Sequence, residues 1–198
     1  MRSIRAVAAV AILALALATG IGAALATGDD KRSERRATAV IHDTAGQRVG
    51  VAVFKERGGK VIVSAHVSRL ASGFHGFHVH SIGQCVPPPS AGGHFNPGDE
   101  SHGDHAGDVP SLLVNEDGTA QLQFATDRFS IGDLFDADGS ALIVHADRDN
   151  YANIPDRYIQ EATGIPGPDA DTLATGDSGE RVACGIIEMD RRDDDDDD

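Results

Sequence analysis

Residues 48–67 read RVGVAVFKERGGKVIVSAHV, in which apolar and polar side chains alternate on both sides of Gly58-Gly59. Alternation with a period of two is typical of a β-strand that buries one face. Two glycines between such runs favour the tight turn of a hairpin. The segment therefore predicts two antiparallel strands, Arg48–Glu56 and Lys60–Val67.

Six further segments have the length and composition of short strands, and no segment shows a helical period longer than two turns. These segments are Thr38–His42, His75–Ser81, Ser111–Asn115, Ala120–Ala125, Ala141–Ala146 and Val182–Glu188. Many short strands separated by glycine-rich turns indicate an all-β domain, either a two-sheet sandwich or a barrel. Residues 83–110 and 147–181 interrupt this pattern and are rich in Gly, Pro and Asp, as functional loops often are.

The first 26 residues have the features of a secretory signal peptide. Arg2 and Arg5 precede a long apolar run, and Ala24-Leu25-Ala26 matches the small-residue pattern of a signal peptidase site. We expect cleavage after Ala26. An uncleaved membrane anchor is the alternative, since the apolar stretch is just long enough to span a bilayer.

After this segment we expect a flexible lead-in at residues 27–36, one folded domain at residues 37–190 and a disordered acidic tail at residues 191–198. The formal net charge of −14 argues against nucleic acid as a partner, and against membrane contact beyond N-terminal anchoring. An exported chain with two cysteines, Cys85 and Cys184, is expected to form one disulfide. A free thiol or a cysteine-bound metal is the less favoured alternative. We expect a secreted, periplasmic or cell-wall-associated protein.

Six of the nine histidines lie where metal ligands would be expected. Five of them, with Asp108, fall in the motifs GFHVH (76–80), GGHFNP (92–97) and HGDHAGD (102–108), and His145 ends an apolar run. Because side chains alternate between the faces of a strand, His78 and His80 point the same way and can bind one ion. His75 has the opposite parity and is predicted to be a structural, hydrogen-bonded histidine.

Sites made only of imidazoles suit copper or zinc, whereas a carboxylate among imidazoles is typical of zinc. The pattern therefore predicts two neighbouring ions, one with three or four imidazole ligands and one with mixed ligands. His145 alone would be interpreted as a core histidine, but together with His78 and His80 it is predicted to be a ligand. One alternative remains open: the short spacing of His102 and His105 also fits a solvated acidic loop with weak or absent zinc.

With these motifs, the sequence resembles the copper,zinc superoxide dismutase family, and in particular its exported bacterial branch. The resemblance rests on GFHVH, GGHFNP, HAGD and the closing GERVACGII, and it extends from about Ala37 to Glu188. It implies a Greek-key β-sandwich, or flattened barrel, of about eight antiparallel strands with two long functional loops. It also implies disproportionation of superoxide to molecular oxygen and hydrogen peroxide by redox cycling of a His-bound copper, supported by an adjacent zinc.

The resemblance assigns a role to each matched residue, and His94 is common to both metal sites. Copper would be held by His78, His80, His94 and His145, and zinc by His94, His102, His105 and Asp108. Asp149 would hydrogen-bond to one histidine of each site. Arg181 would guide and orient the superoxide anion, and His94 would also carry a proton. Cys85 and Cys184 would form the family disulfide.

Two other classes of protein compete with this hypothesis. One is a copper-binding or copper-delivery protein on the same fold without dismutase activity, and the other is a sandwich module for adhesion. The complete set of copper-type histidines, together with Arg181, disfavours both. We expect superoxide as the substrate, and a homodimer is one possible assembly. Residues 147–181 carry more acids than bases, which predicts weak electrostatic steering of the anion.

Overall fold

The computed structural model describes residues 35–86 and 88–191. The predicted signal peptide, nearly all of the lead-in and the Asp193–Asp198 run lie outside the described residues. The chain divides into two units, Met1–Arg32 and Ser33–Asp198, and all described residues belong to the second. Within that part, no helix is long and apolar enough to cross a membrane.

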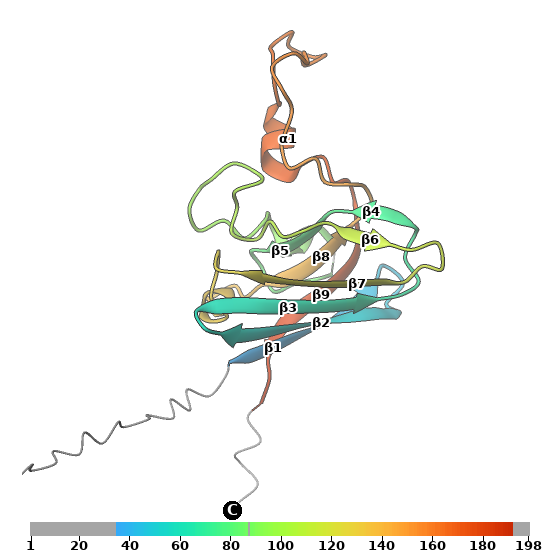
Figure 1. Ribbon diagram of the computed structural model, residues 1–198, viewed down its shortest axis with the longest axis vertical. Coiled ribbons are helices and arrows are strands. Elements are labelled where there is room, and N and C mark those ends of the chain that lie inside the picture. The colour runs from blue at the N-terminus through green and yellow to red at the C-terminus, as the bar shows by residue number, and fades with distance from the viewer. Residues whose placement is uncertain (1–34, 87, 192–198) are drawn as a thin grey trace, which may run out of the picture. The chain divides into compact units, whose positions relative to one another are not determined.

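The described unit is an all-β domain, as the alternation of side chains predicts (Figure 1). Its strands are β1 (Arg36–Asp43), β2 (Arg48–Arg57), β3 (Lys60–Val67), β4 (Gly73–His75), β5 (Phe77–His80), β6 (Leu112–Val114), β7 (Ala120–Thr126), β8 (Ala141–His145) and β9 (Arg181–Met189). Three short helices complete it: η1 (Pro88–Ala91), η2 (Gly132–Phe135) and α1 (Ala170–Thr175).

Seven strands form one curled antiparallel sheet in the order β5-β8-β9-β1-β2-β3-β7, and β4 pairs with β6 in a second, two-stranded sheet. The predicted hairpin at Gly58-Gly59 joins β2 to β3, with Arg57 opposite Lys60. Both glycines have positive φ, 59° and 75°, which a two-residue hairpin turn requires. The predicted sandwich or flattened barrel is confirmed.

Alternate residues of the strands fill the interior of the curled sheet. On β2 and β3, for example, Phe54, Val61 and Val63 are fully or almost fully buried. The alternate residues that face outward include charged ones, such as Lys55 and Arg57, and half-buried apolar ones, such as Val53 and Ile62. This main hydrophobic core supports the rest of the domain, and a smaller buried cluster of Ala91, Ala141 and Ile143 packs on β8. The residues of β5 and β8 are buried on both faces.

The predicted strand His75–Ser81 differs from the structure because it is divided at Gly76 into β4 and β5. The Gly76 amide donates to the Asp147 carbonyl, and the His145 amide donates to the Gly76 carbonyl. A Cβ atom at this position would collide with the side chain of Ser178, so only glycine fits. The division places the two halves of the segment in different sheets.

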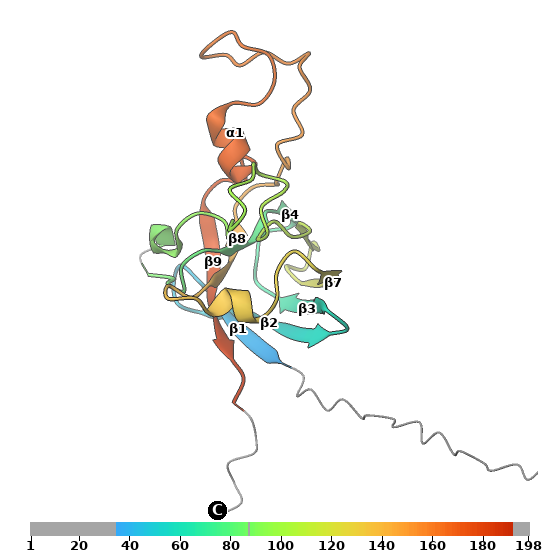
Figure 2. The ribbon, with the colours of Figure 1, turned by 90° about the vertical axis from the view of Figure 1, so that its left-hand side faces the viewer.

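The two long loops lie at the same end of the sheet, beside α1 (Figures 1 and 2). The His102 amide in the first loop donates to the Leu173 carbonyl on α1, over 2.8 Å. Asp169 caps the start of α1, because its side chain accepts from the Thr172 amide. Gly176, in the left-handed conformation, caps the end of the helix. Residues far apart in the sequence are thereby brought to the end of β5 and β8.

Candidate metal centre

Four histidines converge at the end of β5 and β8. His78 and His80 come from β5, His145 ends β8, and His94 lies in the first long loop. Each offers a ring nitrogen within 4.8 Å of the others, and all four side chains are buried. The hydrogen-bonded register of β5 with β8 holds this set, because His80 lies opposite Ala141 and His78 opposite Ile143. The parity argument for His78 and His80 therefore agrees with the structure.

Backbone carbonyls orient two of these rings. The Nδ1 of His80 lies 3.0 Å from the Gly92 carbonyl, and the Nδ1 of His145 lies 3.0 Å from the Gly179 carbonyl. A carbonyl only accepts, so in each neutral ring the proton sits on Nδ1 and the lone pair on Nε2. These two Nε2 atoms face each other at 3.3 Å. Two lone pairs so close repel each other unless a cation lies between them.

His78 is oriented by a carboxylate. Its Nε2 donates to Asp149 Oδ2 over 2.8 Å, which leaves Nδ1 directed toward the cluster. This Nδ1 is buried and has no hydrogen-bond partner. An orphaned ring nitrogen among imidazole lone pairs fits a metal ligand, since buried polar atoms otherwise find partners.

A second cluster shares His94 and contains His102, His105 and Asp108. The Oδ1 of Asp108 lies 2.8 Å from the Nδ1 of His94, 3.2 Å from that of His102 and 3.3 Å from that of His105. Three nitrogens and one carboxylate oxygen thus surround one point, as in a closed tetrahedral zinc site. Although only two residues separate His102 from His105 in the sequence, both side chains reach the same carboxylate oxygen.

Asp149 joins the two clusters. One of its oxygens accepts from His78, and the other accepts from the Nε2 of His102 over 2.7 Å. The remaining Nδ1 of His102 is buried too, and it makes no hydrogen bond of good geometry although Asp108 Oδ1 lies 3.2 Å away. A carboxylate that holds one histidine of each cluster fixes the tautomer and orientation of both rings.

Electrostatics differ between the clusters. Burial lowers the pKa of His94 to about 4 although Asp108 opposes it, and burial also lowers the pKa of His145 to about 3. Burial likewise works against the charged form of His102, but Asp108 and Asp149 raise its pKa to about 9. Burial resists ionisation of Asp108, yet His102 and His94 hold the pKa of this carboxyl far below its usual range. Burial lowers the pKa of His80 as well, so His80, His94 and His145 of the first cluster are neutral imidazoles, whereas the second cluster contains a charged pair.

Arg181 lies beside the first cluster, because β8 and β9 place it directly opposite His145. Its guanidinium donates to the Gly92 carbonyl, the same carbonyl that orients His80. Burial lowers the pKa of Arg181, but a guanidinium stays protonated in proteins, so the side chain remains a cation. It therefore presents a fixed positive charge next to the four imidazoles.

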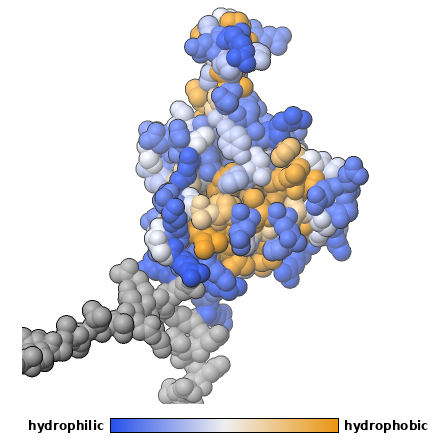
Figure 3. Space-filling model, in the orientation of Figure 1, coloured by the Kyte–Doolittle hydropathy of each residue, from blue (hydrophilic) through white to orange (hydrophobic). Residues whose placement is uncertain are grey.

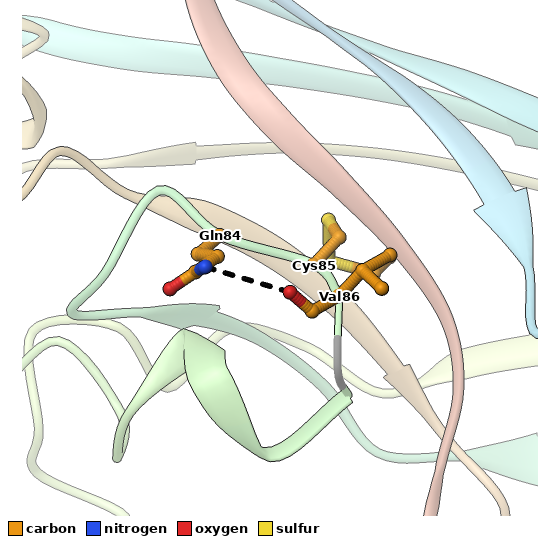
Figure 4. Close-up of a disulfide and its surroundings, with 4 residues drawn as sticks. Gln84, Cys85 and Val86 are labelled. Atoms are coloured by element: carbon orange, nitrogen blue, oxygen red, sulfur yellow. Dashed lines mark hydrogen bonds between the residues drawn. A yellow bond between two sulfur atoms is a disulfide. The ribbon is translucent and has the colours of Figure 1, made fainter.

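The loop that carries Gly92 is tied to β9 by the Cys85–Cys184 disulfide, whose Cα atoms are 5.7 Å apart (Figure 4). The predicted disulfide is confirmed. It joins residues 99 positions apart in the sequence. The cross-link thereby connects the loop that orients His80 to the strand that carries Arg181.

His75 is in neither cluster, as its parity predicts. Its ring nitrogens lie 2.7 Å from the His145 carbonyl and 2.8 Å from the Ala71 carbonyl. Two other residues were not singled out from the sequence. Arg128 donates to the carbonyls of Gly103 and His105, over 3.0 Å and 3.1 Å. The second is Gly92, which begins the motif GGHFNP, although nothing in that motif indicates that its carbonyl binds His80 and Arg181. Arg128 belongs to none of the motifs quoted above.

The residues that converge here lie in the motifs that suggested a family, and comparison with known proteins agrees. The sequence model described as Copper/zinc superoxide dismutase (SODC) matches residues 48–187. The chain belongs to this family. Among curated copper-zinc superoxide dismutases, that of Mycobacterium tuberculosis is 39% identical over 179 residues, covering 81% of this chain and 74% of the relative.

Two further proteins are similar to this chain over most of its length. An extracellular copper-zinc superoxide dismutase of Brugia pahangi is 33% identical over 161 residues, covering 76% of this chain and 74% of the relative. A solved structure, the crystal structure of the clock protein EA4, has 28% identity and a TM-score of 0.64. It covers 78% of this chain and 94% of that chain.

Proposed function

We propose that this protein is a superoxide dismutase with copper and zinc as its cofactors. The reaction converts two superoxide anions and two protons into one molecule of oxygen and one of hydrogen peroxide. The observation that carries the proposal is the buried set of four imidazoles with the Arg181 cation beside it. Imidazole nitrogens suit copper, and a cation suits an anionic substrate.

In this proposal, His78, His80, His94 and His145 hold copper, and His94, His102, His105 and Asp108 hold zinc. Copper supplies the two accessible oxidation states that the reaction needs. The two orphaned nitrogens, Nδ1 of His78 and Nδ1 of His102, fit these assignments, one in each cluster. The neutral state of His94 and His145 fits them as well, because a metal ligand must be deprotonated.

His94 is suited to carry a proton for the reaction. Its Nδ1 lies 2.8 Å from Asp108 in the second cluster, and because the two nitrogens of an imidazole point in different directions, its Nε2 is left for the first cluster, to which His94 also belongs. A proton held on this Nε2 is within the first cluster and can pass to the reduced product. Asp108 keeps the ring oriented while the proton moves.

Arg181 binds and orients the anion. Its donation to the Gly92 carbonyl fixes the guanidinium, and its positive charge suits an oxygen anion. Residues 147–181 carry more acids than bases, so we expect weak steering. A steep fall of the rate with rising ionic strength would contradict that expectation.

A copper-delivery protein is the second candidate, and one experiment separates the two. Superoxide removal is measured with the copper- and zinc-loaded protein, with His80→Ala and with His66→Ala, an exposed histidine on β3. We expect full activity in the loaded protein and in His66→Ala, and background activity in His80→Ala. A loaded protein that binds copper and removes no superoxide would favour delivery.

We also propose that the mature protein is exported. The Cys85–Cys184 disulfide supports this, because disulfides persist in oxidising compartments. The relative from Brugia pahangi is described as extracellular. N-terminal sequencing of protein recovered outside the cytoplasm should begin at Thr27, and a start at Met1 would favour a retained anchor. Sedimentation of the same material tests whether a homodimer forms.

A further inference from the structure

A groove crosses the outer face of the sheet, away from the metal centre. It has a volume of about 420 Å³ and a floor that includes Val53 and Ile62. Its other lining residues are Arg36, Lys55, Arg57, Ser64, His66 and Gln123. Figure 3 shows apolar side chains on this face, over β2, β3 and β7, with hydrophilic ones at the margins.

Positive charge collects at one end of the groove. Arg36 lies opposite Lys55 across β1 and β2, and Arg57 lies opposite Lys60 across β2 and β3. Like charges in directly opposite positions destabilise a sheet. Asp190 pairs with Arg36 over 2.6 Å, and Asp127 lies 3.9 Å from Lys60. In the part of the chain that the structure describes, neither Lys55 nor Arg57 has an ion pair.

The C-terminal chain leaves the domain at the rim of this groove. Strand β9 ends at Met189, and the next amide, that of Asp190, donates to the Arg36 carbonyl over 2.9 Å. The ion pair of Asp190 with Arg36 holds the same point. The sequence then continues through two arginines to six consecutive aspartates, Asp193–Asp198.

We propose that the Asp193–Asp198 segment docks in the basic groove of its own chain. Neighbouring strands are about 4.8 Å apart, so the groove from β1 to β7 spans roughly 15 Å. The eight residues after Asp190 reach up to about 26 Å when extended, which is sufficient. Aspartates beside Lys55 and Arg57 would relieve the repulsion of the opposed cations. Because the segment is tethered at the rim, its effective concentration is high even though each exposed ion pair is weak.

Carbodiimide cross-linking tests the proposal, because it joins a carboxylate to a lysine amine only when the two are in contact. The chain has three lysines, Lys31, Lys55 and Lys60. At low salt, peptides from the tail should be attached mainly to Lys55, with a smaller yield at Lys60. Arg57→Gln should lower the Lys55 yield about two- to fivefold, the effect of losing one exposed ion pair. The matched control Arg48→Gln, at the other end of β2, should leave it unchanged.

Three results would overturn the proposal. The first is equal attachment of the tail to Lys31 and Lys55. The second is a yield of cross-linked Lys55 that is the same with and without Arg57→Gln. The third comes from a mixture of ¹⁵N-labelled and unlabelled protein, in which heavy tails joined to light Lys55 would show that a second copy supplies the tail.

A second measurement does not depend on lysine chemistry. A chain that ends at Arg192 should bind a fluorescent polyglutamate peptide more tightly than the full chain, because its groove is uncovered. Arg57→Gln in the shortened chain should remove this gain. Equal affinity of the full and shortened chains, or a gain that survives Arg57→Gln, contradicts the docked tail.

Discussion

The two halves of the metal centre are built differently. His78, His80 and His145 stand on β5 and β8, where interstrand hydrogen bonds fix the register. His102, His105 and Asp108 lie in a loop, outside the named strands. This loop meets the edge of β5 where the Val79 amide donates to the Gly107 carbonyl. A strand places ligands by parity alone, whereas a loop needs contacts from elsewhere in the chain.

Those contacts come from several distant elements. Arg128, which follows β7, donates to two carbonyls of the loop. The Asp108 side chain accepts from the amides of Gly103 and His105, and α1 bonds to the amide of His102. The zinc half therefore depends on more of the molecule than the copper half does, and it should be the easier half to disturb.

Loss of a ligand from each half gives the largest expected effect. His78→Ala removes a copper ligand and should reduce superoxide removal to background, because the redox-active ion is lost. His105→Ala touches only the zinc cluster and should lower zinc affinity by more than about 100-fold while copper still binds. Metal analysis and activity of both variants check this. Equal loss of copper in the two variants would contradict independent halves.

Asp149→Asn should weaken both halves together. The amide can donate, so it no longer accepts from both His78 and His102 as the carboxylate does. We expect a decrease of about 10- to 100-fold in affinity for each metal, measured by competition with chelators. Asp156→Asn, on the exposed part of the same loop, serves as the control. A decrease in affinity for only one of the two metals would show that Asp149 does not support both clusters.

Gly176→Ala, at the C-terminal end of α1, should disturb the metal centre. Gly176 has a φ of 61°, and a Cβ atom there would collide with Asp149 and His102. Gly164→Ala is a matched control, since its φ is 69° and no atom lies within 4 Å of the added carbon. Each substitution should cost about 1 kcal/mol of backbone strain, and Gly176→Ala up to about 3 kcal/mol in total. Thermal unfolding measures the difference, and equal melting temperatures would refute the collision.

The halves should also differ in their response to pH. In the metal-free protein, the His102 proton stabilises the fold below its ordinary pKa of 6.5, and this contribution is lost as the pH rises through about 9. Zinc must displace that proton, so its affinity should rise by up to about tenfold per pH unit between 7 and 9. His94 and His145 are already neutral there, so copper affinity should change less. Parallel slopes for the two metals would contradict this.

The smallest expected effect concerns the support of the loop. Arg128→Gln removes the donors to Gly103 and His105 without touching a ligand. Zinc affinity should fall by about tenfold or less, at the lower end of the range for residues outside the ligand set. Copper affinity should not change, and a chelator titration of each metal checks both statements. A larger decrease in copper affinity than in zinc affinity would contradict this prediction.

The sequence predicts best the segments in which side chains alternate with a period of two. The boundaries of β3 match the prediction residue for residue, and the parity of His78 and His80 correctly separated them from His75. The division at Gly76 escaped prediction because it depends on Ser178, about a hundred residues away. The carbonyls of Gly92 and Gly179 carry no side-chain signal at all. Family resemblance, rather than spacing, assigned His94 to both clusters and brought Asp149 into the site.

The Gly92 carbonyl accepts from both His80 and Arg181, and the disulfide ties its loop to β9. A newly made chain with reduced cysteines already contains every histidine ligand, yet its loop is not held to β9. In that chain, hydrogen bonds alone set the distance between the loop and β9. The cross-link therefore works as a brace, which keeps one carbonyl in reach of a ring on β5 and a guanidinium on β9 at the same time.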